Sequence, residues 1–227
     1  MINNKIPILY SFRRCPYAMR TRIFLLLSNI KVEIREIKLS SKPKEMIDIS
    51  KKGTVPVMLL PNQKVIDESI EIMDWALDLS DPLDINYKNK IHEKETKEVL
   101  KIFEGEFKHH LDRYKYFSRY NNENRLNNKE EHRNIALENL KIIENKLNKN
   151  YPWIFGKKIS YLDIAILPFV RQYRIADINW FDNNMDLINV SKWLQEFLEW
   201  DVFIDSMKKY KLWGPSDSPT YFGNQVE

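Results

Sequence analysis

Cys15 is the only cysteine among the 227 residues of the chain, and its surroundings are suited to thiol chemistry. It stands directly before Pro16, and proline is typical of the first position of a helix, so Cys15 is the expected N-cap. Four arginines flank it: Arg13, Arg14, Arg20 and Arg22. Unpaired N–H groups at a helix start and nearby cations both favour a reactive thiolate. The alternative is a buried structural cysteine.

The composition limits the kinds of partner that this thiol serves. A single cysteine forms no internal disulfide, which fits a reducing compartment and predicts a cytoplasmic protein. The apolar runs are too short for a signal peptide or a membrane span. Residues 1–80 carry 13 basic and 9 acidic side chains and the rest of the chain 23 of each, so the net charge of +4 arises in the first third. The four arginines around Cys15 lie in this part of the chain and suit a small anionic ligand better than nucleic acid, and the alternative is a solvated basic face. Neither nucleic acid nor a membrane is an expected partner.

The first part of the chain predicts a small mixed sheet that positions Cys15. In order, the patterns indicate a strand at 6–10, a helix from 16, a strand at 31–39, a short helix at 42–50, two strands within 55–68 and a helix at 69–79. This β-α-β-α-β-β-α order is typical of a thioredoxin-like α+β domain with helices on both faces of the sheet.

The rest of the chain predicts a helical domain. Residues 80–86, "SDPLDIN", have the polar, proline-containing composition of a linker. Helical patterns follow at roughly 87–118, 128–148, 160–176 and 190–209, with an asparagine-rich loop at 119–131. The expected organisation is therefore a thioredoxin-like domain at 1–79, a linker at 80–86 and an all-α domain at 87–227.

One pair of residues in the helical domain has a structural role by its spacing. Ser160 stands where the helix at 160–176 begins, and Asp163 follows three residues later. This is the spacing of a capping box, in which each residue bonds to the backbone of the other. We expect the pair to fix the start of a buried helix and to take no part in chemistry.

Four motifs in register carry a resemblance to a known family. "CPYA", residues 15–18, resembles the CPYC motif of glutaredoxins with the second cysteine replaced by Ala18. "SSKP", "TVPVM" and "DES" follow at 40–43, 54–58 and 67–69. With the all-α second domain, the chain resembles a cytosolic glutathione transferase of the cysteine type, closest to the omega class.

The resemblance implies a glutathione site in the first domain. Lys42 is similar to the lysine that meets the glycine carboxylate of glutathione in this class. The Val55–Pro56 pair looks like the family's cis-proline turn, whose backbone pairs with the cysteinyl unit. Glu68 would then accept from the α-ammonium group, and Ser69 would donate to the γ-glutamyl carboxylate. Glutathione is the implied co-substrate, no metal is expected, and the family is usually dimeric.

Other residues have two open readings. Tyr10 and Ser11 lie where other transferase classes keep a hydroxyl that activates glutathione, but Tyr10 also fits the end of a strand. Aromatic and apolar side chains could form packing contacts or line a second-substrate pocket, which in this family lies between the domains: Phe12, Tyr17, Leu111 and Tyr114. His109 and His110 have no cysteine or carboxylate partner at metal-ligand spacing, so a metal site is not expected.

The sequence as a whole predicts a glutathione-dependent thiol transferase with Cys15 as its nucleophile. Without a second cysteine, the mixed disulfide formed at Cys15 needs an outside thiol for release. Reduction of dehydroascorbate is a family activity that the resemblance permits. Two alternatives stay open: conjugation of glutathione to electrophiles through Tyr10 or Ser11, and a non-catalytic binding or regulatory protein of the same fold.

Overall fold

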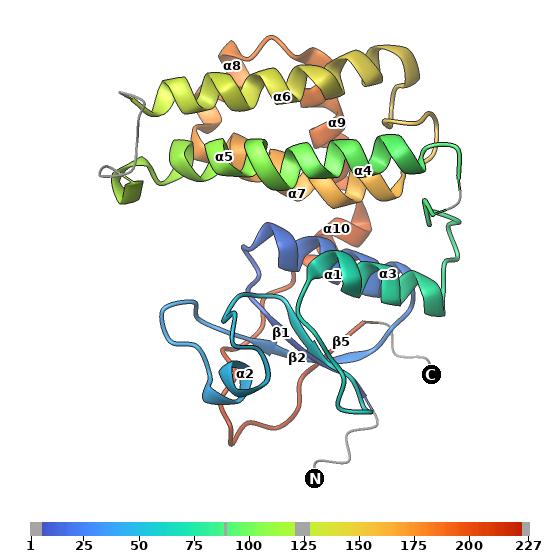
Figure 1. Ribbon diagram of the computed structural model, residues 1–227, viewed down its shortest axis with the longest axis vertical. Coiled ribbons are helices and arrows are strands. Elements are labelled where there is room, and N and C mark those ends of the chain that lie inside the picture. The colour runs from blue at the N-terminus through green and yellow to red at the C-terminus, as the bar shows by residue number, and fades with distance from the viewer. Residues whose placement is uncertain (1–5, 89, 121–127, 224–227) are drawn as a thin grey trace. The chain divides into compact units, whose positions relative to one another are not determined.

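The computed structural model describes residues 6–88, 90–120 and 128–223. The chain divides into two compact units (Figure 1). The first unit combines Met1–Asn86 with Trp200–Glu227, and the second unit is Tyr87–Glu199. The predicted linker at 80–86 therefore ends at Asn86, the last residue of the first unit before the second unit begins at Tyr87.

The first unit is built on a mixed five-stranded sheet with strand order β4-β3-β1-β2-β5. Its strands are β1 (Ile8–Ser11), β2 (Val32–Glu36), β3 (Val57–Leu59), β4 (Val65–Ile66) and β5 (Tyr221–Phe222). β1 runs parallel to β2 and antiparallel to β3. The β-α-β arrangement with a following hairpin is the thioredoxin-like layer that the sequence predicts, which confirms the fold class.

Helices cover both faces of this sheet. They are α1 (Pro16–Leu27), α2 (Lys44–Ile49) and α3 (Ser69–Leu79). α1 and α3 pack against each other on one face, and α2 lies on the other (Figure 1). Successive side chains of a strand point to opposite faces, so β1 divides its residues between these two layers.

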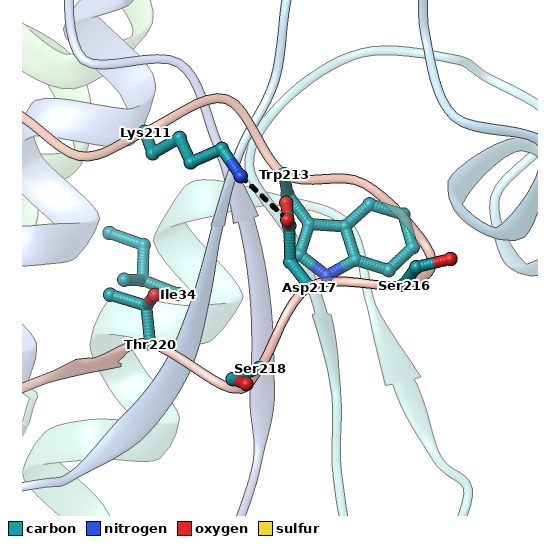
Figure 2. A pocket seen from close by; sticks show the side chains of 7 residues that line it. All are labelled: Ile34, Lys211, Trp213, Ser216, Asp217, Ser218 and Thr220. Carbon is teal, nitrogen blue, oxygen red and sulfur yellow. Dashed lines mark hydrogen bonds and ion pairs between the residues drawn. The ribbon is translucent and has the colours of Figure 1, made fainter.

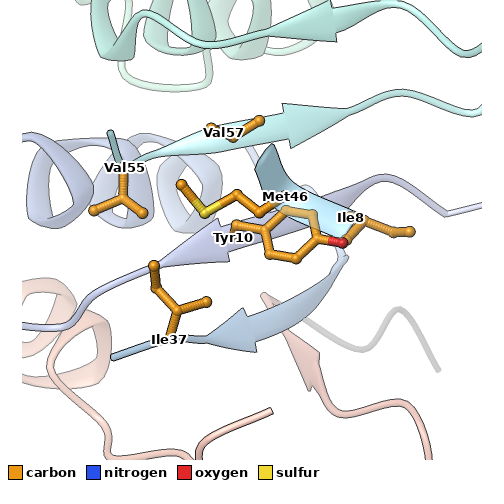
Figure 3. Packing of buried hydrophobic residues seen from close by; sticks show 6 residues of the cluster. All are labelled: Ile8, Tyr10, Ile37, Met46, Val55 and Val57. Carbon is orange, nitrogen blue, oxygen red and sulfur yellow. The ribbon is translucent and has the colours of Figure 1, made fainter. Parts of the chain in front are cut away.

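The layer beneath α2 is the hydrophobic core nearest to Cys15. Ile8 and Tyr10 of β1 point into it together with Met46 of α2 (Figure 3). Val55 comes from the turn before β3 and Val57 is the first residue of β3, and the half-buried Cys15 packs against the same cluster. The proline turn and the thiol thus share one packed layer, which holds their backbones in place.

The second unit is helical. Its helices are α4 (Glu93–Ile102), α5 (Lys108–Lys115), α6 (Lys129–Asn150), α7 (Tyr161–Ala176), α8 (Ile178–Asn184) and α9 (Ile188–Glu199). A π-helical turn at Phe103–Phe107 joins α4 to α5, so the pattern predicted at 87–118 is one interrupted helix that begins at Glu93. Within the part of the chain that the structure describes, no helix is long and apolar enough to cross a membrane.

The C-terminal tail differs from the expected all-α domain at 87–227. α9 ends at Glu199, Trp200 has an extended backbone, and α10 (Asp201–Ser206) starts a segment that packs in the first unit. β5 then pairs antiparallel with β2, where Phe222 stands opposite Val32. Local patterns do not reveal this pairing because it joins residues far apart along the chain.

Two further differences concern the helical patterns. α8 was not predicted, and its start is fixed by Asp177, whose side chain accepts from the N–H of Trp180 at 3.0 Å. The asparagine-rich loop predicted at 119–131 lies largely outside the described residues. Its described ends are a 3₁₀ turn at Phe117–Tyr120 and Asn128, the N-cap of α6.

Candidate functional site

Cys15 is the N-cap of α1, as the sequence predicts. Its backbone is extended, Pro16 begins the helix, and among the described residues no side chain caps this end. The Cys15 N–H donates to the carbonyl of Phe12 at 2.9 Å, which closes the turn between β1 and the helix. The thiol is half-buried and lies at an open helix N-terminus, the position that favours a thiolate.

A cis-proline turn lies beside the thiol. The Val55–Pro56 peptide is cis, and the Sγ of Cys15 is 3.6 Å from the carbonyl oxygen of Val55. Gly53, two residues earlier, has φ +62°, a left-handed conformation that favours glycine. The exposed Lys42 reaches the same turn, since its Nζ is 3.6 Å from the point where a Cβ on Gly53 would stand. The cis-proline turn at Val55 therefore has the thiol of Cys15 and the ammonium group of Lys42 beside it.

Glu68 and Ser69 form the start of α3. Glu68 is the N-cap with a side chain that is 58% exposed, and Ser69 is the first helical residue and only 3% exposed. The first N–H groups of a helix have no partner within it and attract anions. An exposed carboxylate beside a buried hydroxyl and these donors suits a group that carries both an ammonium and a carboxylate.

Lys52 is a residue of this site that the sequence did not single out. Its Nζ donates to Asp67 at 3.0 Å and to Glu68 at 2.7 Å. Asp67 also accepts from the Ser50 hydroxyl at 2.7 Å, and these two contacts lower the pKa of Asp67. An ammonium group bound at Glu68 would share that carboxylate with Lys52. The only signal in the sequence was the basic pair that precedes the glycine and the Val-Pro turn.

Of the four arginines that flank Cys15 in the sequence, the two in α1 are buried and bond to other residues of the first unit. Arg22 is fully buried and forms an ion pair with Glu36. Its Nε also donates to the Ser11 hydroxyl at 2.9 Å. Arg20 is equally buried and donates to Ser69. Both point into the first unit, where Arg20 reaches the start of α3 and Arg22 reaches the ends of β1 and β2.

The Arg22–Glu36 pair holds the segment before Cys15. Glu36 accepts from the N–H of Arg13 at 2.7 Å, while Arg22 also donates to the carbonyl of Ser206 at 3.2 Å. Glu36 ends β2 directly opposite Ser11 of β1. The pair therefore joins the end of both central strands to the loop that presents the thiol and to the C-terminal segment.

The hydroxyls of Tyr10 and Ser11 are engaged elsewhere. Tyr10 accepts from Nη1 of Arg35 at 2.6 Å, and burial raises the pKa of this phenol. The Ser11 hydroxyl accepts from Nε of Arg22 on the opposite face of the sheet. A raised pKa makes the tyrosine a weaker acid, and both side chains are buried, so neither hydroxyl is exposed to a thiol bound at the helix start.

The residues proposed for a second-substrate pocket occupy different environments. Phe12 is half-buried against the core near Cys15, and Tyr17 lies under the Arg20 guanidinium at 5.1 Å from its ring centre. Leu111 and Tyr114 are buried in the second unit, where Tyr114 packs against Tyr173 with ring centres 5.5 Å apart. Of the two open readings, packing accounts for Leu111 and Tyr114.

The capping box at the start of α7 is present, as predicted. Ser160 accepts from the N–H of Asp163, and Asp163 accepts from the N–H of Ser160 at 2.8 Å. Asp163 also accepts from Ile154 N–H at 3.0 Å and from Trp193 Nε1 at 2.8 Å. Complete burial raises its pKa to about 6 despite these donors. The carboxylate is thus an internal anchor of the second unit.

Histidines of α5 and α6 form a pair that the sequence did not predict. The Nδ1 atoms of His110 and His132 are 2.8 Å apart, and His109 packs against His110. Burial and the neighbouring histidines lower the pKa of His110 to about 4. Among the residues described, no cluster of three or more histidine, cysteine or acidic side chains suits a metal ion.

A cavity of about 370 Å³ lies at the edge of the sheet (Figure 2). The C-terminal tail forms most of its wall, with Trp213 on one side and an ion pair between Lys211 and Asp217. Its lining is Ile34, Lys211, Trp213, Ser216, Asp217, Ser218 and Thr220. This cavity is separate from the set formed by Cys15 and the starts of α1 and α3.

Comparison with known proteins identifies the family to which the chain belongs. A model described as the glutathione S-transferase N-terminal domain matches residues 9–82, and one for the C-terminal domain matches residues 112–201. The chain belongs to the glutathione S-transferase family. Glutathione S-transferase omega-1 of Rattus norvegicus is 27% identical over 175 residues, which span 75% of this chain and 68% of that protein.

Solved structures of other glutathione transferases share the fold. Omega 3C of Trametes versicolor superposes with a TM-score of 0.73 at 18% identity, over 92% of this chain and 86% of that one. A family member from Pseudomonas fluorescens with two glutathione bound gives a TM-score of 0.73 at 20% identity, over 89% and 92%. The 27% identity to an omega-class relative agrees with the motifs in the first eighty residues of the chain.

Proposed function

We propose that this omega-like transferase is a glutathione-dependent thiol transferase with Cys15 as its nucleophile. The observation that carries the proposal is the position of the thiol at the open start of α1, 3.6 Å from the Val55 carbonyl beside the cis-proline. A thiolate there meets the helix N–H groups, and a peptide thiol paired with the Val55 backbone would lie next to it.

The proposed reaction is two successive thiol–disulfide exchanges. The Cys15 thiolate attacks the glutathione sulfur of a glutathionylated substrate, and the substrate leaves as a thiolate that takes a proton from water. Cys15 then carries glutathione as a mixed disulfide. The thiolate of a second glutathione attacks the glutathione sulfur of that disulfide, oxidised glutathione leaves, and the Cys15 thiolate is regenerated. Ala18, fully buried where glutaredoxins have a second cysteine, supplies no internal resolving thiol.

The remaining site residues complement the two ends of glutathione. Lys42, exposed above Gly53, is assigned to the glycine carboxylate. Glu68 is assigned to the α-ammonium group and Ser69, at the start of α3, to the γ-glutamyl carboxylate. Charge-assisted contacts of this kind contribute about 1.5–3 kcal/mol each to binding.

Conjugation of glutathione to electrophiles is the second candidate. It requires a hydroxyl that stabilises the glutathione thiolate, whereas Tyr10 and Ser11 are only 2% and 0% exposed. Their burial favours the cysteine mechanism. A non-catalytic binding protein has no need for a half-buried thiol beside residues of the types assigned to both ends of glutathione.

Intact-mass analysis tests the proposal. Incubation with oxidised glutathione should add one glutathionyl group to the protein, and reduced glutathione should remove it. The adduct should form faster than with cystamine, a disulfide that lacks both carboxylate ends of glutathione. The matched control is Cys15→Ser, which should stay unmodified. The proposal fails if no adduct forms, or if cystamine reacts as quickly.

Three finer expectations depend on this function. Reduction of dehydroascorbate is an activity that the same cysteine chemistry would support, and the omega-class resemblance motivates it. A homodimer is the expected assembly, since the family is usually dimeric. A cytoplasmic location follows from the single thiol, which must stay reduced to react.

A further inference from the structure

The guanidinium group of Arg20 contacts the hydroxyl of Ser69 with two N–H groups. Nε lies 3.1 Å and Nη2 2.8 Å from the Ser69 Oγ. Arg20 is 1% exposed and Ser69 3% exposed, so this contact is buried in the first unit. The two residues belong to different helices, α1 and α3, which pack against each other.

This contact fixes the direction in which the Ser69 hydroxyl donates. A hydroxyl has two acceptor lone pairs and one hydrogen, and a guanidinium has five N–H donors and no acceptor. The two N–H groups of Arg20 occupy the lone pairs of Oγ, so the hydroxyl hydrogen must point away from Arg20. The positive charge behind the oxygen also makes this O–H a stronger donor toward an anion.

The same contact joins the two helix starts of the proposed site. Arg20 lies on α1, whose N-cap is Cys15, and its guanidinium also covers the ring of Tyr17 in the first turn. Ser69 is the first residue of α3. The side chain that orients the Ser69 hydroxyl is therefore attached to the helix that presents the thiol.

We propose that Arg20 is a positioning residue for the γ-glutamyl carboxylate of glutathione, acting through Ser69. The proposal rests on the thiol-transferase function proposed above. Arg20 holds the Ser69 oxygen in place and directs its hydrogen to the carboxylate, while the N–H groups at the start of α3 supply further donors. It thereby sets the position of the γ-glutamyl end relative to the Cys15 sulfur.

The test measures how fast the mixed disulfide forms at Cys15 with two disulfides. One is oxidised glutathione, and the other is the disulfide of cysteinylglycine, which lacks the γ-glutamyl unit. The variants are Arg20→Met, Arg20→Lys, Ser69→Ala and the double variant Arg20→Met with Ser69→Ala. The matched control is Lys64→Met, which removes an exposed positive charge between β3 and β4.

For Arg20→Met, we expect the half-saturating concentration of oxidised glutathione to rise about tenfold, with the limiting rate within about twofold. The reaction with the cysteinylglycine disulfide should be unchanged. The double variant should lose no more than Ser69→Ala alone, because both changes remove one contact. Arg20→Lys keeps the charge but not the fork of donors, so a rise of about threefold is expected.

The outcomes separate this inference from the function on which it rests. If Ser69→Ala leaves both disulfides unaffected, the γ-glutamyl site itself is wrongly placed. If Ser69→Ala weakens the response to oxidised glutathione but Arg20→Met does not, the positioning role is overturned. Equal slowing of both disulfides by Arg20→Met also overturns it. Should Arg20→Met fail to fold, Arg20→Lys carries the test by the same comparison.

Discussion

Two helix starts of this transferase contrast in how their N–H groups are used. α1 begins at Cys15, and in the described part of the chain no side chain caps it. α7 begins at Ser160, where a complete capping box with Asp163 closes the helix end. The open start leaves donors and partial positive charge beside a thiol, whereas the closed start uses its donors within the protein.

The same contrast holds between α3 and two further helices of the second unit. α3 starts at Glu68, whose side chain bonds to Lys52 and not to its own helix. In the second unit, α6 and α8 are capped by Asn128 and Asp177, which accept from N–H groups of their own first turns. Among the described residues, the two helices that begin at the candidate site, α1 and α3, thus lack a side-chain cap, as do α2, α4 and α10, whereas side chains cap α6, α7 and α8 of the bundle.

The largest expected effect is on activity, from changing the open start of α1. Cys15→Ala should abolish thiol transfer, by at least about 1,000-fold, because the chain has no other thiol to carry the covalent intermediate. Glutathione bound beside the alanine would keep its own sulfur free, so conjugation should be equal or higher. A paired assay with a glutathionylated disulfide and an aryl halide measures both activities.

The matched variants for this prediction are Tyr10→Phe and Ser11→Ala. Each should keep thiol transfer within about tenfold, since both hydroxyls are engaged with arginines. If Cys15→Ala retained transfer while Tyr10→Phe lost both activities, the cysteine would be a bystander and the conjugating function would replace thiol transfer.

The second effect is on stability, from opening the closed start of α7. Asp163→Asn places an amide where two carboxylate oxygens accept from Ile154, Ser160 and Trp193. Buried donors then lose acceptors, so the free energy of unfolding should fall by about 3 kcal/mol. Urea denaturation measures the change. The mixed-disulfide rate at Cys15, measured on the folded fraction, should stay the same, and a selective loss of that rate would break the contrast.

The third effect is on binding at the open start of α3. Glu68→Ala removes the acceptor for the α-ammonium group, so the affinity for glutathione should fall by about 1–3 kcal/mol. Calorimetry on the Cys15→Ala background, which prevents disulfide formation, measures it. Glu71→Ala removes an acidic side chain from the same first turn and is the matched control. Equal affinity in the Glu68 variant would mean that the site has been assigned to the wrong helix start.

The smallest effect is a pH dependence in the second unit. The pKa of His110 is lowered to about 4 in the folded protein, chiefly by burial and then by His109 and His132. The unfolded chain therefore takes up a proton near pH 6.5, before the folded protein does. Above pH 6.5, His110 therefore contributes no pH dependence to stability. As the pH falls from 6.5 toward 4, the difference in proton uptake at His110 progressively reduces the free energy of unfolding.

Comparison with His110→Gln isolates this term. Between pH 7 and 5, the wild type should lose about 1 kcal/mol more stability than the variant, after allowance for the partial exposure of the ring. Asp163 has the opposite effect, because its raised pKa makes the folded protein bind the extra proton between pH 3.8 and about 6. That contribution is common to both proteins and cancels in the difference. Identical pH profiles would show that His110 does not stay neutral on folding.

Features that depend on a few neighbouring residues were predicted correctly from the sequence. The N-cap at Cys15 follows from Pro16, and the capping box from the three-residue spacing of Ser160 and Asp163. Both are governed by the hydrogen bonds of a single helical turn. The bounds of α3 also agree, since its helical pattern lies in its own residues. The cis peptide at Val55–Pro56 agrees with what the family resemblance implied.

Features that depend on contacts distant in sequence were decided by the tertiary structure. The sequence by itself determined that Cys15 begins a helix, that Ala18 leaves it without a resolving partner, and that the chain carries the motifs of an omega-like transferase. It did not determine that Arg20 and Arg22 turn away from the thiol to Ser69 and Glu36, because that direction depends on which face of α1 meets the sheet and α3. Nor did it place the tail 200–227 in the first unit, since strand pairing is a long-range choice made by packing and backbone hydrogen bonds.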